Sequence, residues 1–462
     1  MATATATDLA AQLERVVGAE HVRADPGALL AYATDATPLE RGRPDVVVFP
    51  ASTEEVAAIV RLAGEQRVPV VPRGSGTNLS AGTVATQGGI VLVLTRMNRI
   101  REVSTDDLVA VCEPGVRTIE LAQAAARQRL LFPPDPGSHT TATIGGNVAE
   151  CSGGLRALKY GVTRDYVLGV EAVLGTGEVI RSGGRLVKDV AGYDLRRLLC
   201  GSEGTLAVMT ELTLRLVPAP EASGTGMAYF PDLGDAARAV SAVLASGVLP
   251  VTLEFLDRVC IDAVEGYARI GLDRSAGALL IFGQDGDLAS IERDMARMAQ
   301  ACEAEGATEV RIAASEAEAA DVLAARRAVL PALSRLEPLT ILEDATVPRS
   351  RIAEMVARIQ EIAARHGLTI GTFGHAGDGN LHPTVVLDPG DEAAVQRAHE
   401  AFDEIFGVAI AMGGSITGEH GVGLVKLRHL ERQLGAEQLA LLRRIKHAFD
   451  PYGILNPGKL GS

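Results

Sequence analysis

Four of the nine histidines lie between positions 375 and 420. His375 and His382 are seven residues apart, and the glycines between them allow a bend that could bring both imidazoles to one side. Glu419 and His420 follow in a separate loop. Two histidines and a carboxylate are a common ligand set for a borderline divalent ion with positions left open for substrate. The pattern favours a metal centre built from two of these imidazoles and the carboxylate.

The alternative for each histidine is an ordinary hydrogen-bonded side chain in the core or at the surface. We keep that interpretation for five others that lie on predicted loops or helix faces: His21, His366, His399, His429 and His447. We likewise expect Lys426, shortly after the Glu-His pair, to be a surface charge.

A second set of residues could bind a phosphorylated cofactor. A strand predicted at 68–71 runs directly into Arg73–Ser80, RGSGTNLS. Glycine permits positive φ, so successive backbone N–H groups can converge on an anion. The segment lacks the Lys-Ser/Thr of a P-loop and the third glycine of a dinucleotide-binding fingerprint. An ordinary glycine turn remains the alternative for this loop taken alone.

Further glycine-rich and hydroxyl-rich segments follow at 133–138, 143–147, 151–154 and 201–206. Together they offer close backbone approach, hydroxyls and N–H groups to a long, flat ligand with a diphosphate. A flavin dinucleotide fits this inventory better than a mononucleotide does. Residues 132–154 show little periodicity, and we expect a long functional segment without regular structure there.

The elements that must position these residues indicate an α+β fold. Strands are predicted at 45–49, 68–71, 90–94, 108–112, 167–174, 206–217 and 368–373. Helices are predicted at 52–66, 118–130, 287–306, 315–331, 350–366 and 437–449. Pro218-Ala219-Pro220 is a credible domain boundary, and at about 150 residues per domain a chain of 462 residues suggests two or three domains.

Composition excludes several classes of protein. The net charge of −14 disfavours nucleic acid and anionic membranes as partners. The five scattered cysteines disfavour a disulfide scaffold or an iron–sulfur cluster and favour a reducing cytoplasm. We expect no transmembrane segment and no signal peptide, because no sufficiently long apolar run and no basic n-region occur.

Eight segments resemble the FAD-binding family typified by vanillyl-alcohol oxidase and para-cresol methylhydroxylase. Within it they are similar to the branch of the glycolate oxidase D subunit, FAD-linked D-lactate dehydrogenase and D-2-hydroxyglutarate dehydrogenase. The segments are PRGSGTNLSAG (72–82), PPDPGS (133–138), TIGGNVAECSGG (143–154), KYGVTRDYV (159–167), GSEGTLAV (201–208), GHAGDGNLHP (374–383), GGSITGEHGVG (413–423) and FDPYGILNPGK (449–459).

The resemblance implies an FAD-binding domain of two α+β subdomains at 1–218, a ferredoxin-like α/β cap domain at 219–430, and a C-terminal helix and tail at 431–462 that return to the FAD domain. Thr77 stands where many relatives carry a flavin-linked histidine, so the FAD is expected to be non-covalent. Cys151 is read as a small buried thiol rather than a flavin attachment. The implied FAD-binding residues are Arg73, Gly74, Ser75, Gly76, Thr77, Asn78, Pro136, Gly137, Thr143, Gly145, Gly146, Asn147, Ser152, Gly153, Glu203, Gly204, Leu206 and Asn456.

The resemblance also implies oxidation of a 2-hydroxy acid, with hydride passing to the flavin. His375, His382 and Glu419 match the metal ligands of relatives. The metal, zinc, manganese or iron, would lower the pKa of the substrate hydroxyl, and His420 would take its proton. Arg326 and Asn380 match substrate-binding positions. Leu342 replaces a lysine of the 2-hydroxyglutarate enzymes, which favours a small monocarboxylate such as glycolate or D-lactate.

Three alternatives remain open from the sequence. They are a D-2-hydroxyglutarate-type dehydrogenase, an FAD-binding subunit with little activity alone, and a metal-dependent hydrolase using the same three ligands. Reoxidation requires an external acceptor, for which a separate iron–sulfur subunit is one candidate. The expected location is the cytoplasm, with any membrane association through a partner.

Overall fold

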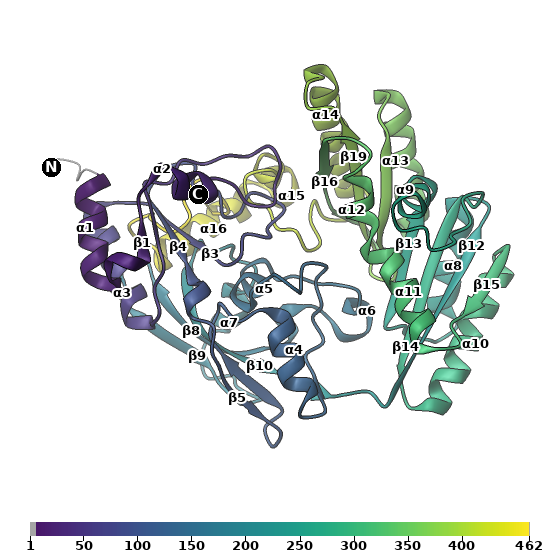
Figure 1. Cartoon of the computed structure of the whole chain (residues 1–462), viewed down its shortest axis with the longest axis horizontal. Coiled ribbons are helices and arrows are strands. Elements are labelled where there is room, and N and C mark those ends of the chain that lie inside the picture. Colours follow the sequence, from purple (N-terminus) through teal and green to yellow (C-terminus); the bar gives the residue numbers. More distant parts are fainter. Residues whose placement is uncertain (1–5, 462) are drawn as a thin grey trace. The chain divides into compact units, whose positions relative to one another are not determined.

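The structure is a computed structural model that describes residues 6–461 (Figure 1). The chain forms two compact units. The first comprises the chain up to Ser152, Val162–Ala219 and the chain from Glu419 onward. The second comprises Gly153–Gly161 and Pro220–Gly418. Both units combine helices with β-sheets, so the predicted α+β class is confirmed.

A small sheet in the first unit precedes the glycine-rich loop. Its elements are β1 (Val22–Arg23), β2 (Val46–Val48), β4 (Ile90–Val93) and β3 (Val70–Arg73), with α1 (Ala6–Val17) and α3 (Thr53–Gln66). Strands β2, β4 and β3 are parallel, and β2 and β4 are entirely buried, as expected of strands covered on both faces. Helix α3 begins at its predicted cap, where Ser52 Oγ accepts from Glu55 N–H at 3.2 Å.

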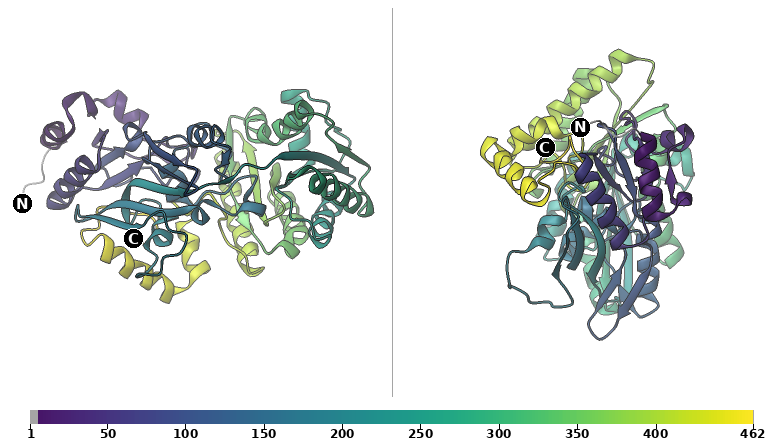
Figure 2. Two further views of the ribbon diagram at one scale, coloured as in Figure 1. Left: turned by 90° about the horizontal axis from the view of Figure 1, so that it is seen from below. Right: turned by 90° about the vertical axis from the view of Figure 1, so that its left-hand side faces the viewer.

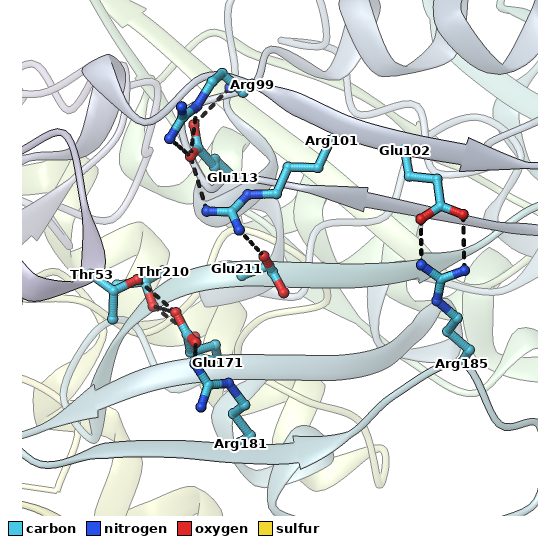
Figure 3. A network of polar contacts seen from close by, with 10 residues as sticks. All are labelled: Thr53, Arg99, Arg101, Glu102, Glu113, Glu171, Arg181, Arg185, Thr210 and Glu211. Atoms are coloured by element: carbon cyan, nitrogen blue, oxygen red, sulfur yellow. Dashed lines mark hydrogen bonds and ion pairs between the residues drawn. The ribbon is translucent and has the colours of Figure 1, made fainter.

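An antiparallel sheet forms the second layer of this unit. In spatial order its strands are β5 (Ile100–Ser104), β6 (Val109–Cys112), β10 (Ala207–Arg215), β8 (Val167–Leu174) and β9 (Val179–Gly183). Charged side chains link its strands, because the fully buried Glu113 carboxylate accepts from both Arg99 and Arg101 (Figure 3). Glu171 accepts from Thr53 at 2.6 Å and so ties α3 to the sheet.

The segment 132–154 contains helix α5 (Ile144–Glu150), so the prediction that it lacks regular structure was wrong in this part. Thr143 caps the helix, and Gly145 lets it pack directly on Pro114, where a Cβ would lie 2.6 Å from the proline Cβ. The other connecting elements of this unit are η1 (Ala19–His21), α2 (Pro26–Ala31), η2 (Leu94–Arg96), α4 (Thr118–Ala126), β7 (Leu130–Leu131), η3 (Thr163–Asp165), α7 (Leu195–Leu199) and β11 (Val217–Pro218).

The C-terminal segment belongs to the first unit. It contains η5 (Leu427–His429), α15 (Leu430–Leu434) and α16 (Ala436–Phe449), drawn in yellow in Figure 2. After α16 the chain pairs with β3 through a parallel bridge between Val70 and Leu455. The roles assigned to 1–218, 219–430 and 431–462 remain predictions, while the return to the first unit begins at Glu419, earlier than position 431.

The second unit is built on an eight-stranded antiparallel sheet. Its main path is β15 (Glu309–Ile312), β12 (Ala222–Phe230), β14 (Ala278–Gly286), β13 (Thr252–Asp257), β18 (Ile370–His375), β19 (Asn380–Leu387) and β16 (Leu339–Leu342), with β17 (Ala345–Thr346) pairing with β19. If β12, β13, β14 and β15 are numbered 1 to 4 along the chain, their spatial order in the sheet is 4-1-3-2. This is the order of the predicted ferredoxin-like layer.

Helices cover both faces of this sheet. One face packs against α8 (Leu233–Ala245), α10 (Leu288–Ala304), α13 (Ile352–His366) and α14 (Glu392–Ala411). The other packs against α9 (Arg258–Ala268), α11 (Glu316–Arg327) and α12 (Val329–Leu333). The short elements are α6 (Ala157–Tyr160) and η4 (Arg349–Arg351). Within residues 6–461, no helix has both the length and the apolar character needed to cross a membrane.

The buried carboxyl group of Asp257 should make stability depend on pH. It accepts the N–H groups of Cys260 and Thr372 at 2.9 and 2.7 Å, and burial raises its pKa from 3.8 to about 6. The native state therefore binds more protons than the unfolded state between about pH 4 and 6, and the contribution of this group falls as pH rises through that range. We expect the free energy of unfolding of wild type minus that of Asp257→Asn to decrease from pH 4 to pH 6. A difference that stays constant across this range in urea unfolding would contradict the prediction.

Candidate functional site

His375 and His382 lie on the two strands of one β-hairpin. Strand β18 ends at His375 and β19 begins at Asn380; the register pairs these two residues and also pairs Phe373 with His382. Cross-strand partners share a face, as do residues two apart on one strand. His375, Asn380 and His382 therefore project from the same face, and the two imidazole centroids are 5.1 Å apart.

Glu419 completes a potential ligand group. One ligand atom from each of His375, His382 and Glu419 lies within 4.8 Å of the others. Glu419 is joined to Gly418, whose N–H donates to the fully buried Asp344 carboxylate at 2.6 Å. Two imidazole nitrogens and one carboxylate oxygen fit zinc, manganese or iron, so the donor set suits the expected ion.

The two predicted substrate residues lie in the same unit as the histidines. Arg326 is buried, its Nε donates to Glu254 Oε2 at 2.6 Å, and its guanidinium carbon lies 4.7 Å from the Phe373 ring centroid. Four of its five N–H donors remain for other partners, including an anion. Asn380 Oδ1 accepts from Thr346 Oγ1 at 3.3 Å.

His420, the predicted base, directly follows Glu419. Its Nε2 lies 3.9 Å from Glu419 Oε1, and its carbonyl oxygen accepts from Ser80 Oγ at 2.9 Å. The histidine side chain is only 10% exposed. An imidazole held in this way can act as a proton acceptor beside an ion bound to Glu419.

The turn after His420 rests on two buried carboxyl groups. Glu203 accepts the N–H groups of Val422 and Gly423 at 2.7 and 2.8 Å, and Gly421 lies against Glu150. Burial, followed by the charge of Glu203, raises the pKa of Glu150 well above its ordinary value. Burial also raises the pKa of Glu203, against the effect of its two backbone hydrogen bonds. Glu203, predicted to bind the cofactor, thus holds the backbone next to the predicted base.

The proposed diphosphate loop offers free donors. It follows β3, and among residues 6–461 the N–H groups of Ser75, Gly76 and Thr77 make no hydrogen bond. The Arg73 guanidinium is buried and anchored by a 2.7 Å bond from Nη1 to Thr34 O. Half-buried N–H groups beside a fixed cation fit an anionic diphosphate, so this loop is compatible with FAD.

A second predicted segment meets this loop. Thr143 Oγ1 accepts from Gly146 N–H at 3.4 Å at the start of α5, and a Cβ on Gly74 would overlap that same oxygen. Asn147 Nδ2 donates to Thr118 Oγ1 at 2.7 Å, which anchors helix α5 to the start of α4. Of the remaining predicted cofactor residues of this unit, Gly137 is exposed, and the others are half-buried or buried: Asn78, Pro136, Gly145, Ser152, Gly204 and Leu206. Gly153 is the first residue assigned to the second unit.

Replacing Gly74 with alanine should weaken FAD binding. The new methyl group would overlap Thr143 Oγ1, and overpacking of this kind costs about 1–3 kcal/mol, or ~5–150-fold in affinity. Flavin fluorescence on dilution measures the dissociation constant. Gly184→Ala is the matched control, because a Cβ there meets no atom within 4 Å and Gly184 is not among the predicted FAD-binding residues. Equal weakening in both variants would show that the overlap is not the cause.

Asn456, also predicted to bind the cofactor, has its side chain fully engaged within the protein. Its Nδ2 donates to Gly82 O and Glu203 O at 2.8 and 2.7 Å, and its Oδ1 accepts from Lys459 Nζ at 2.8 Å. Burial lowers the pKa of Lys459 to about 8. The observed contacts of the Asn456 side chain therefore pin the C-terminal tail, and its cofactor role remains a prediction.

Cys151 is buried, as predicted, but it has an unexpected polar neighbour. Arg164 Nε lies 3.2 Å from its sulfur. A hydrogen bond from the Cys200 thiol lowers the pKa of Cys151 to about 6, and Arg164 adds to this effect. The five cysteines are all free and buried.

Three buried groups near the predicted residues were missed from sequence: Glu254, Asp344 and Glu150. In the sequence, each is an acidic residue within a largely apolar strand or a glycine-rich segment. That position does not reveal which residue it contacts. The surface position predicted for Lys426 was wrong, because its side chain is fully buried. Its charge helps to lower the pKa of Glu203.

Two solved structures show the class of fold. Para-cresol methylhydroxylase matches with a TM-score of 0.83 and 16% identity, over 98% of this chain and 96% of that chain. The 4-ethylphenol oxidase of Gulosibacter chungangensis gives 0.80 and 21%, over 98% and 97%. The fold is therefore the one predicted, that of vanillyl-alcohol oxidase and para-cresol methylhydroxylase.

Sequence comparisons give the family. Residues 44–183 match an FAD binding domain, and residues 219–460 match the C-terminal domain of FAD linked oxidases. Glycolate oxidase subunit GlcD of Bacillus subtilis is 50% identical over 98% of this chain and 96% of its own length. D-lactate dehydrogenase of Archaeoglobus fulgidus is 41% identical over 90% and 91%. The chain belongs to the FAD-linked oxidase family and is an FAD-linked oxidoreductase, which removes the hydrolase alternative.

Proposed function

We propose that the protein oxidises a small D-2-hydroxy acid, glycolate or D-lactate, to the 2-oxo acid. The reaction moves a hydride from the substrate carbon to FAD and a proton from the hydroxyl to a base. Bound FAD supplies the two-electron acceptor, and a divalent ion supplies a Lewis acid. The observation that carries the proposal is the ligand group of His375, His382 and Glu419 with His420 next in the chain.

Each residue has a separate task in this proposal. His375, His382 and Glu419 would hold the ion, and His420 would take the hydroxyl proton at an imidazole nitrogen. The terminal N–H groups of Arg326 would bind the substrate carboxylate as a bidentate fork. Non-covalent FAD follows from Thr77, whose hydroxyl cannot replace the histidine that carries a covalent flavin.

Leu342, which replaces the lysine of the 2-hydroxyglutarate enzymes, supports a small substrate with one carboxylate. This residue lies half-buried on β16 and packs against the core on the Arg326 side of the sheet. It offers no charge to a second carboxylate, which supports a monocarboxylate over 2-hydroxyglutarate. The names of two relatives, a glycolate oxidase subunit and a D-lactate dehydrogenase, agree with this choice.

The test is anaerobic mixing of the purified holoprotein with glycolate, D-lactate, L-lactate and D-2-hydroxyglutarate, read by bleaching of the flavin absorbance. We expect bleaching with glycolate or D-lactate, little with the other two, and loss of bleaching after treatment with a chelator. Bleaching by D-2-hydroxyglutarate alone, or by none of the four acids, would refute the proposed substrate class.

We further propose that the chain works as one subunit of a larger oxidase, because two relatives are named as glycolate oxidase subunits. Electrons would then pass to an external acceptor, with an iron–sulfur subunit as the candidate partner. Rapid substrate reduction of the isolated flavoprotein, combined with slow reoxidation that a co-purified partner accelerates, would support this. Fast turnover of the isolated chain with a quinone would oppose it.

A further inference from the structure

One buried carboxylate connects a proposed metal ligand with the proposed substrate arginine. Glu254 is 1% exposed and lies in β13, between β14 and β18. Its Oε1 is 2.7 Å from His375 Nδ1, and its Oε2 accepts from Arg326 Nε at 2.6 Å. Each carboxylate oxygen therefore serves a different member of the site.

This arrangement follows from the register of the sheet. The register pairs Glu254 with His375, so the two side chains project from the same face. Their neighbours on β13, Leu253 and Phe255, point to the opposite face and join the core beneath α8 and α13. Arg326 reaches the carboxylate from α11, which covers the face that carries Glu254.

We propose that Glu254 is the positioning residue of this site: it fixes His375 for metal binding and Arg326 for anion binding. The inference rests on the proposed function. A carboxylate that accepts from Nδ1–H holds the proton on that nitrogen, so Nε2 is the nitrogen that can face an ion. The same contact fixes the plane of the ring and increases its basicity.

A carboxylate is required because two donors meet at this position. His375 Nδ1–H and Arg326 Nε–H both need an acceptor, and an ionised carboxylate offers one oxygen to each. Glutamine offers one oxygen and one NH₂ group. In either orientation of the amide, one partner faces a donor: Arg326 loses its bond, or His375 changes to the tautomer that protonates Nε2.

Charge leads to the same conclusion. Glu254 and Arg326 form a buried ion pair of zero net charge, so the pair adds no net positive charge beside His375. Without the carboxylate, the guanidinium would be a buried charge without compensation, next to the position of a divalent cation. The changed tautomer of His375 and the uncompensated charge of Arg326 would both weaken metal binding.

The experiment compares metal affinity in Glu254→Gln, Glu254→Asp and wild type, each as FAD holoprotein stripped of metal. Binding of Co²⁺ is followed by its visible absorption and binding of Zn²⁺ by competition with a chromophoric chelator, both without substrate. We expect Glu254→Gln to lose ~10–100-fold in affinity, the range typical of outer-shell partners. Glu254→Asp keeps two acceptor oxygens and should retain more affinity than Glu254→Gln.

Asp257→Asn is the matched control, because Asp257 is a buried carboxylate on the same strand whose hydrogen bonds are to Cys260 and Thr372 and not to His375 or Arg326. It should bind both ions as wild type does, and the flavin spectrum and thermal unfolding verify that every variant is folded. A further readout is the KM of the hydroxy acid, which should rise in Glu254→Gln as Arg326 loses its partner.

Wild-type affinity in Glu254→Gln would overturn the inference, as would equal losses in Glu254→Gln, Glu254→Asp and Asp257→Asn. These outcomes differ from failure of the proposed function, in which wild type itself binds neither Co²⁺ nor Zn²⁺ and the flavin is not bleached by any hydroxy acid.

Discussion

His420→Asn is expected to slow reduction of the flavin by substrate by ~10²–10⁴-fold while FAD remains bound. Asparagine can reproduce a hydrogen bond of the imidazole, but it cannot accept a proton at working pH. The backbone around position 420 should persist, because Ser80 holds the carbonyl of His420 and Glu203 accepts the N–H groups of Val422 and Gly423. Anaerobic stopped-flow absorbance measures the rate of bleaching, and the flavin spectrum of the starting protein measures occupancy.

His447→Asn is the control for this substitution. His447 is exposed on α16 in the same unit, so it tests the effect of the same change away from the site. It should reduce at the wild-type rate. If His420→Asn reduced as fast as this control, the histidine would not be the base, and the proton would have to go to another group.

The pairing of the two histidines in the proposed ligand group could be predicted from sequence because they are close along the chain. His375 and His382 belong to one hairpin, so their approach depends on a turn of four residues and not on the tertiary fold. Glu254 could not be found this way. It is 121 positions before His375, and only the β13–β18 register brings the two together. Sequence alternation places Glu254 opposite Leu253 and Phe255, but it does not say which strand lies beside it.

The segment 132–154 and Lys426 show what sequence reasoning predicted wrongly. The glycines that predicted an unstructured ligand loop at 132–154 also form part of α5, where Gly145 allows direct contact with Pro114. Lys426 was predicted to be exposed because lysine usually is, whereas it is buried in a segment that returns to the first unit after the long stretch Pro220–Gly418 of the second. Burial that depends on such long-range packing cannot be predicted from the neighbouring residues in the sequence.

His382→Ala should severely weaken metal binding and slow substrate oxidation. The variant leaves one imidazole and one carboxylate, and the loss of affinity should exceed the ~10–100-fold expected for the outer-shell residue Glu254. Without the ion the substrate hydroxyl keeps its high pKa, and the loss of several kcal/mol of stabilisation should slow flavin reduction by ~10³-fold or more. Metal analysis by mass spectrometry and anaerobic bleaching with D-lactate or glycolate measure the two effects.

His399→Ala provides the comparison, since His399 is half-buried on α14 of the same unit and is not one of the three ligands. It should keep both metal and activity. A chelator should reproduce the His382→Ala phenotype in wild type, and added Zn²⁺ or Mn²⁺ should restore the chelated wild type but not the variant. If His382→Ala lost its metal yet still bleached at the wild-type rate, the ion would be structural, and proton removal by His420 would have to proceed without a Lewis acid.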